Sequence, residues 1–179
     1  MSEEHSMNSV NQHYLDKVMT LAEERDIQAT EDIFDSRGMK LVAKGTLISR
    51  TLQERLIMRR LSKPLESSIA VESGVDIQVI LKAAEQVIET VKPMRAILAT
   101  MQSGPGPLDV LKGIRFGNAM STMLTLVEKG GEAALAHSAM VSVLSICLAQ
   151  KFRMSAADQT SVALAGLLHD IGELYIAPE

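Results

Sequence analysis

Most hydrophobic positions of this chain recur at intervals of three and four residues, the spacing that places side chains on one face of an α-helix. The clearest stripe follows Asp76, a predicted N-cap, and we expect Pro93 to end or kink that helix. Ser155 and Asp158 have the spacing of a capping pair before the last stripe. The stripes predict helices over residues 9–25, from 49 or 51 to about 63, 77–91, 108–128, 132–151 and 155–171.

Residues 29–49 depart from this helical pattern. Two short apolar runs, residues 33–34 and 39–42, flank a polar turn that ends in Gly38, where a left-handed residue is expected. This arrangement predicts a small β-hairpin, and residues 65–71 are expected to be extended. The predicted fold class is therefore mainly α: a helical bundle with a small β-hairpin in the N-terminal part.

The strongest interruption of the pattern is the run Gln-Ser-Gly-Pro-Gly-Pro at residues 102–107. We interpret this run as a candidate domain boundary. The predicted organisation has three parts: a helix, hairpin and helix module over residues 1–74, a connecting helix and linker over 75–105, and a helical domain over 106–179.

The composition narrows the class of protein. Apolar residues make up 46% of the chain, aromatic residues only 3%, and methionine occurs 11 times, so the core is expected to be aliphatic and rich in methionine. A net charge of −4 argues against a general binder of nucleic acid. A single cysteine excludes a disulfide framework and a cysteine-rich zinc site, and a reducing cytoplasm is the expected compartment.

Residues 133–150 carry no formal charge, and this length approaches that of a membrane span. The segment contains His137, three serines and Gln150, however, and no belt of basic or aromatic residues flanks it. We therefore interpret it as the buried central helix of a soluble domain and expect no membrane association.

Two of the four histidines are candidates for chemistry. His5 and His13 lie in a polar stretch and on the first helix, where a solvated position is expected. His137 shares a helix face with apolar residues at spacings of four, seven and eleven, so it is predicted to point into the core. Without the other two candidates, His137 could equally be a structural histidine in the core whose ring makes one hydrogen bond. His169 and Asp170 lie at the end of the last helix, where a loosening terminus lets both side chains converge.

The last two predicted helices are joined by a tight turn at residues 152–154 and should form an antiparallel hairpin. Such a hairpin brings the start of the first helix beside the end of the second, so His137, His169 and Asp170 are predicted to meet. Imidazole and carboxylate ligands together suit Fe, Mn or Zn. A hydrolytic site also needs open coordination positions and normally further protein ligands.

Residues 136–138, Ala-His-Ser, and residues 165–172, Ala-Gly-Leu-Leu-His-Asp-Ile-Gly, resemble the HD superfamily of metal-dependent phosphohydrolases. Within it they are most similar to the HD-GYP proteins, bacterial enzymes that hydrolyse the second messenger cyclic di-GMP. Residues 31–46 also resemble segments found before HD-GYP domains. The resemblance implies an HD-type helical domain, a role in signal transduction, and a cyclic dinucleotide as substrate.

The resemblance also assigns roles to residues. It implies that His137, His169 and Asp170 bind the metal ions of a di- or trinuclear centre, with Asp170 as the catalytic candidate. The later histidine ligands, the distal aspartate and the Gly-Tyr-Pro loop of the family do not occur after residue 170 in this sequence. Ala133 stands where family members often have glutamate, and Glu173 where a lysine commonly follows. We therefore expect the N-terminal fragment of such a phosphodiesterase, inactive as this chain.

Two alternatives remain. The chain could be a non-catalytic HD-related regulatory or dimerisation module, or a plain helical interaction domain whose histidines are structural. Glu173 is either a surface residue or an extra carboxylate ligand. A helix without charges over residues 133–150 needs cover on most sides, and the N-terminal helices can cover only some of it. We therefore expect an exposed apolar helical face that is relieved by self-association or by a rearranged N-terminal segment.

Overall fold

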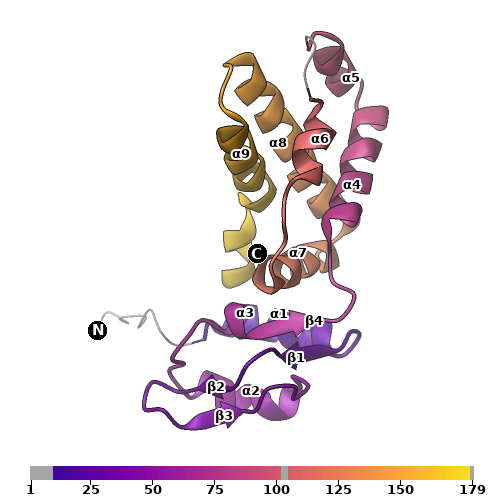
Figure 1. Cartoon of the computed structure of the whole chain (residues 1–179). Helices are drawn as coiled ribbons and strands as arrows, with labels where there is room; N and C mark the ends of the chain where they lie inside the picture. The colour runs from indigo at the N-terminus through magenta and orange to yellow at the C-terminus, as the bar shows by residue number, and fades with distance from the viewer. Residues whose placement is uncertain (1–9, 102–104, 178–179) are drawn as a thin grey trace, which may run out of the picture. The chain divides into compact units, whose positions relative to one another are not determined.

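A computed structural model describes residues 10–101 and 105–177, which form two compact units, each described here by itself (Figure 1). The mixed unit contains the described residues up to Gly74, the segment Gly117–Leu126 and the described residues from Gly172 onward. The helical unit contains Val75–Phe116 and Val127–Ile171. His5 and residues 102–104 of the predicted boundary lie outside the described residues.

The mixed unit combines short helices with two small antiparallel sheets. Its first helix begins at an asparagine cap, since the Asn11 side chain accepts a hydrogen bond from the Tyr14 backbone N–H. The elements assigned to this unit are α1 (Gln12–Ala22), β1 (Ile27–Ala29), β2 (Ile33–Phe34), β3 (Lys40–Val42), α2 (Arg50–Ile57), α3 (Leu65–Ser68), β4 (Ile69–Val71), most of α7 (Asn118–Lys129) and most of the 3₁₀ turn η1 (Ile171–Tyr175).

The hairpin predicted in the N-terminal part is confirmed as β2 and β3, with Ile33 opposite Val42. Gly38 has a φ of +82°, the left-handed conformation expected at the end of the turn. Asp35, only 3% exposed, fixes the turn because its carboxylate accepts the backbone N–H of Met39 at 2.8 Å.

The second sheet was not predicted. β1 pairs antiparallel with β4, and Ile27 lies opposite Val71. Residues 65–71 are therefore extended only in their second half, because Leu65–Ser68 form a short helical turn after Pro64. A proline at the start of a helical turn loses no intrahelical hydrogen bond, so this correction agrees with local backbone chemistry.

The helical unit is built from α4 (Ile77–Thr90), α5 (Lys92–Ala99), α6 (Pro107–Lys112), α8 (Glu132–Lys151) and α9 (Ala156–Leu168). Asp76 caps α4 as predicted, since its carboxylate accepts the N–H groups of Gln78 and Val79 at 2.9 and 3.0 Å. Pro93 lies in the first turn of α5, and α4 ends before it. Buried side chains from all five of these helices form one hydrophobic core.

The single helix predicted over residues 108–128 is wrong. The chain forms α6 and then α7, separated by residues 113–117. Gly113 is the C-cap of α6, and Gly117 provides the carbonyl that accepts the Ser121 N–H at the start of α7. Glycine is unfavourable inside a helix and common at its ends, so these two glycines break the helix that the apolar periodicity had predicted to be continuous.

α8 is the central helix of the helical unit and packs against α4, α5, α6 and α9. By length and composition residues Ala133–Lys151 could also cross a membrane, with a mean hydropathy of 1.6 and 44% of their positions buried. Ala139, Val143, Ile146 and Cys147 lie in the hydrophobic core of the unit. This packing favours the interpretation of α8 as a core helix.

Candidate metal centre

α8 and α9 form the predicted antiparallel hairpin, and the turn between them is fixed by backbone hydrogen bonds (Figure 1). Arg153 has a φ of +54°, and the Met154 N–H donates to the Ala149 carbonyl at 2.9 Å. Ser155 then caps α9 by accepting the N–H of Asp158, as predicted. The start of α8 and the end of α9 consequently lie at the same end of the hairpin.

Small residues let the two helices approach closely. A Cβ placed on Gly166 of α9 would lie 2.9 Å from Ser142 Cα and 3.0 Å from Ser142 N of α8. In the same contact the Ser142 hydroxyl, which is fully buried, donates to the Ala163 carbonyl at 2.7 Å. Side chains at the ends of the helices can therefore meet across the contact.

Three side chains converge where α9 ends. His137 comes from the second turn of α8, His169 is the C-cap of α9, and Asp170 follows it. The Nε2 atoms of the two histidines lie 3.2 Å apart. Asp170 Oδ2 lies 2.8 Å from His169 Nε2 and 3.6 Å from His137 Nε2. This cluster is the one group of three or more potential metal ligands found among the described residues.

The hydrogen bond on the far side of the His169 ring decides its tautomer. His169 Nδ1 lies 2.9 Å from the Gly166 carbonyl oxygen, and a carbonyl can only accept, so Nδ1 carries a proton. In the neutral ring the lone pair then belongs to Nε2, the atom that faces His137 and Asp170. A backbone carbonyl that holds a ligating histidine in this way is common in metal sites.

The spacing of the three atoms matches a shared cation. Ligand bonds of roughly 2.1 Å place neighbouring donors about 3.0 Å apart on an octahedral ion and about 3.4 Å apart on a tetrahedral one. The distances in the cluster, 2.8, 3.2 and 3.6 Å, span these values. Lone pairs this close together repel one another unless a proton or a metal ion lies between them. Two imidazoles and one carboxylate form a ligand set that suits Fe, Mn or Zn.

The cluster is open to solvent. The side chains of His137, His169 and Asp170 are 48%, 32% and 44% exposed. The prediction that His137 points into the core is therefore wrong. α8 carries apolar residues around most of its circumference, and the core is formed by the side that includes Ala139 and Val143, which leaves His137 near the rim.

The other candidates lie outside this cluster. Glu173 is exposed and contributes its backbone carbonyl, which accepts Lys17 Nζ at 2.7 Å within the mixed unit. His13 is exposed on α1, as expected. Cys147 is 4% exposed in the core, and burial raises the pKa of its thiol, so the thiolate needed for metal binding is disfavoured.

Sequence reasoning missed the residues that support the ligands. The sequence analysis gave no role to the backbone of Gly166, a residue of the motif at 165–172, yet its carbonyl orients His169. The signal was present, because a carbonyl three residues earlier on a helix lies beside the side chain at the helix end. Ser142 was counted among polar residues of an apolar helix, whereas it forms the closest contact between the two helices.

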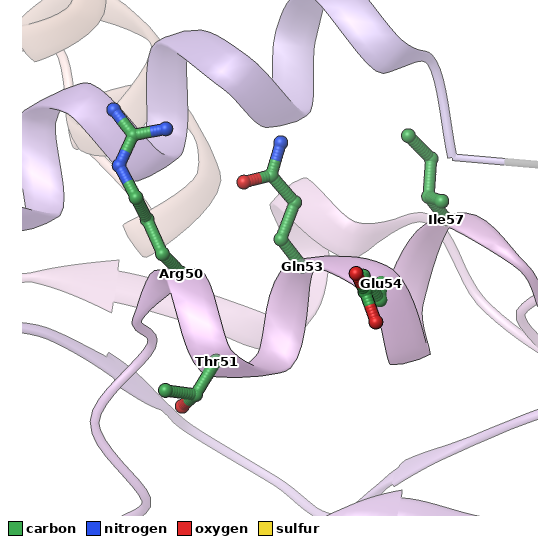
Figure 2. A pocket seen from close by; sticks show the side chains of 5 residues that line it. All are labelled: Arg50, Thr51, Gln53, Glu54 and Ile57. Atoms are coloured by element: carbon green, nitrogen blue, oxygen red, sulfur yellow. The ribbon is translucent and has the colours of Figure 1, made fainter.

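A surface hollow of about 540 Å³ lies on α2 of the mixed unit and holds no such cluster among the described residues. Figure 2 shows Arg50, Gln53 and Ile57 extending from the same side of α2. Arg50 is paired with Glu23, and the Gln53 amide donates to Asp16, so these polar groups already have partners within the fold.

Comparisons of the chain with protein-family models, with curated proteins and with solved structures gave no match. The relationship to the HD superfamily therefore stays a prediction that rests on the motif residues. The geometry, exposure and chemistry of the cluster of His137, His169 and Asp170 are the observations from which a function can be argued.

Proposed function

We propose that this chain binds one divalent transition-metal ion, Fe, Mn or Zn, through His137, His169 and Asp170. We further propose that these residues are the metal-holding part of an HD-type phosphodiesterase site that acts on a cyclic dinucleotide. The observation that carries the proposal is the convergence of three ligand atoms, 2.8 to 3.6 Å apart, from two helices whose ligands are 32 residues apart.

Each residue has a distinct part in this proposal. His169 is held by the Gly166 carbonyl with its Nε2 lone pair toward the centre. His137 approaches from α8, and Asp170 contributes the negative charge that offsets a divalent cation. A bound ion supplies Lewis acidity toward a phosphoryl oxygen and makes a nucleophile from water at neutral pH. Because the side chains are 32 to 48% exposed, coordination positions on the solvent side stay accessible to water and substrate.

Metal binding is tested by titrating the chain with Zn²⁺ and Mn²⁺ in a calorimeter. We expect one ion per chain and a weaker affinity in Asp170→Asn, which keeps the shape of the side chain but loses the charge. His13→Ala is the matched control, since His13 is exposed on α1 and lies outside the cluster. Equal affinities of Asp170→Asn and the unchanged chain, or a loss in His13→Ala, would contradict the assignment.

Hydrolysis is tested separately, with cyclic di-GMP and with bis(p-nitrophenyl) phosphate as substrates. A hydrolytic metal site normally has more protein ligands than the three that meet here, so turnover by this chain is expected to be slow. We expect the metal-loaded chain to bind cyclic di-GMP more tightly than the metal-free chain. Metal binding without any such gain would remove the phosphodiesterase part of the proposal and leave the metal site.

A second candidate function is self-association, and one observation favours it. Leu148, Phe152 and Met154, near the turn between α8 and α9, are 60%, 76% and 36% exposed. These three residues, here called the hairpin tip, form an apolar end on the helical unit. A regulatory or dimerisation module would use such a surface to pair with a second copy.

Sedimentation velocity at several concentrations measures this association. We expect a dimer that dissociates in the double variant with Leu148→Ser and Phe152→Ser, because serine removes the apolar area that pairing would bury. Met58→Ser is the control, since Met58 is 81% exposed on the mixed unit. A monomer at all concentrations would exclude self-association through the hairpin tip.

A further inference from the structure

Positive charge is concentrated in one stretch of this chain. Residues 31–63 contain eight of the 18 lysines and arginines but only four of the 22 aspartates and glutamates, in a chain with a net charge of −4. The stretch includes β2, β3 and α2 and lies wholly within the mixed unit (Figure 1). A local excess of one charge attracts a partner of the opposite charge, even when the whole chain has the other sign.

The fold brings two parts of this stretch together. The Ser36 backbone N–H donates to the Arg60 carbonyl at 2.7 Å, and Asp35 pairs with Leu61 in an antiparallel bridge. The buried carboxylate of Asp35 also lies 3.6 Å from Arg59 Nη1. The turn of the β2 and β3 hairpin therefore lies beside the segment that follows α2.

These two adjoining segments present exposed arginines and methionines. The set, here called the basic face, consists of Arg37, Met39, Met58, Arg59 and Arg60. Met39 and Met58 are 53% and 81% exposed, which is unusual for apolar side chains of this size. The basic face thus combines positive charge with apolar area.

The charge of the basic face is only partly neutralised within the unit. Three of the four acidic residues of the stretch already have a basic partner, and the pairs are Asp32 with Lys40, Glu31 with Lys63, and Asp35 with Arg59. Among the described residues, no acidic side chain pairs with Arg37. The guanidinium of Arg37 is therefore available to an external carboxylate.

We propose that the basic face docks an acidic protein segment that also carries apolar side chains. The planar guanidinium of arginine forms paired hydrogen bonds with a carboxylate, and the flexible side chain of methionine adapts to different apolar partners. Arginine and methionine are both enriched at protein interfaces. Nucleic acid fits less well, because the chain is negative as a whole and the basic face has no aromatic side chain on which bases could stack. This role is independent of the metal centre.

Fluorescence anisotropy tests the docking with a labelled peptide of repeated Glu-Leu-Asp as the probe. A chelator is present, so that no metal ion binds the carboxylates of the peptide. Arg37→Glu is expected to weaken binding about 5-fold, because an attraction is replaced by a repulsion. Met58→Ser is expected to weaken it by about 5-fold as well, because serine removes apolar area that the peptide would cover. Circular dichroism confirms that both variants are folded.

Arg95→Glu is the matched control, since it makes the same change of charge at an exposed position on α5 of the helical unit. It should leave the affinity for the peptide within about 2-fold, because salt screens charges outside the contact. An equal loss in Arg37→Glu and Arg95→Glu would show that the peptide responds to net charge alone, and would overturn the docking site. Absence of binding by the unchanged chain would overturn it too.

Two further probes test the chemistry of the partner. A peptide of repeated Glu-Ser-Asp keeps the charge and loses the apolar side chains, so weaker binding of this peptide supports the role of the methionines. A single-stranded oligonucleotide of the same charge is expected to bind more weakly than the Glu-Leu-Asp peptide. Tighter binding of the oligonucleotide would contradict an acidic protein segment as the partner.

Discussion

Replacing His169 by alanine is expected to weaken the binding of Zn²⁺ by about 100-fold. A four-ligand structural zinc site holds its ion with about 10–16 kcal/mol, so the loss of one ligand removes roughly 3 kcal/mol. His169 should be the most sensitive of the three ligands, because its Nε2 lies within 3.2 Å of both other ligand atoms. Titration calorimetry measures the affinity, and circular dichroism confirms that the variant is folded.

A double-mutant cycle sharpens this test. If His137 and His169 hold the same ion, the two alanine substitutions together should cost much less than the sum of their separate effects. Additive losses would mean that the two histidines act at independent sites. An affinity of His169→Ala within about 3-fold of the unchanged chain, less than 1 kcal/mol, would remove His169 from the ligand set.

Replacing Gly166 by alanine is expected to lower the free energy of unfolding by about 1–3 kcal/mol. Alanine is the better helix former by about 1 kcal/mol, so a substitution governed by propensity alone would stabilise the protein. The new methyl group would instead lie 2.9 Å from Ser142 Cα, a backbone atom that can move only if α8 and α9 separate. Urea unfolding of the whole chain, followed by circular dichroism, measures the difference in the free energy of unfolding.

Gly117→Ala, in the mixed unit, is the control for the change from glycine to alanine itself, because a Cβ at Gly117 meets nothing within 4 Å and the substitution should change the stability of the protein by less than about 0.5 kcal/mol. The close contact also predicts a second effect. Separation of the helices moves the Gly166 carbonyl that orients His169, so Gly166→Ala should weaken Zn²⁺ binding by about 10-fold or more. A stabilised Gly166→Ala variant would show that α8 and α9 do not pack as described.

The helical hairpin and the meeting of its ligands could be predicted from the sequence. Ser155, with Asp158 three residues later, marks the start of α9, and a short turn leaves two helices only the antiparallel arrangement. The orientation of His137 could not be predicted in the same way. Apolar residues surround α8, so periodicity does not identify the buried side, and the contact through Ser142 and Gly166 decides it.

The missed elements have a different cause. β1 has three residues, too few for an alternating pattern to stand out, and its partner β4 follows more than 40 residues later. The long helix expected after residue 107 failed because apolar periodicity was given more weight than Gly113 and Gly117. Within the mixed unit, Tyr175 stacks on Tyr14 and donates to Glu66, and no local pattern connects residues that far apart in the chain.

The Asn11 side chain donates a hydrogen bond to the Tyr175 carbonyl, and this contact has a consequence for how the protein folds. These residues are 164 positions apart, and closing a loop of that length costs about 4–5 kcal/mol of chain entropy. Prior formation of the helical unit, which lies within this stretch of sequence, removes much of that cost because an ordered insert contributes little loop entropy. We therefore expect the Tyr14 and Tyr175 stack to form late in folding, and tyrosine fluorescence should report a phase slower than helix formation.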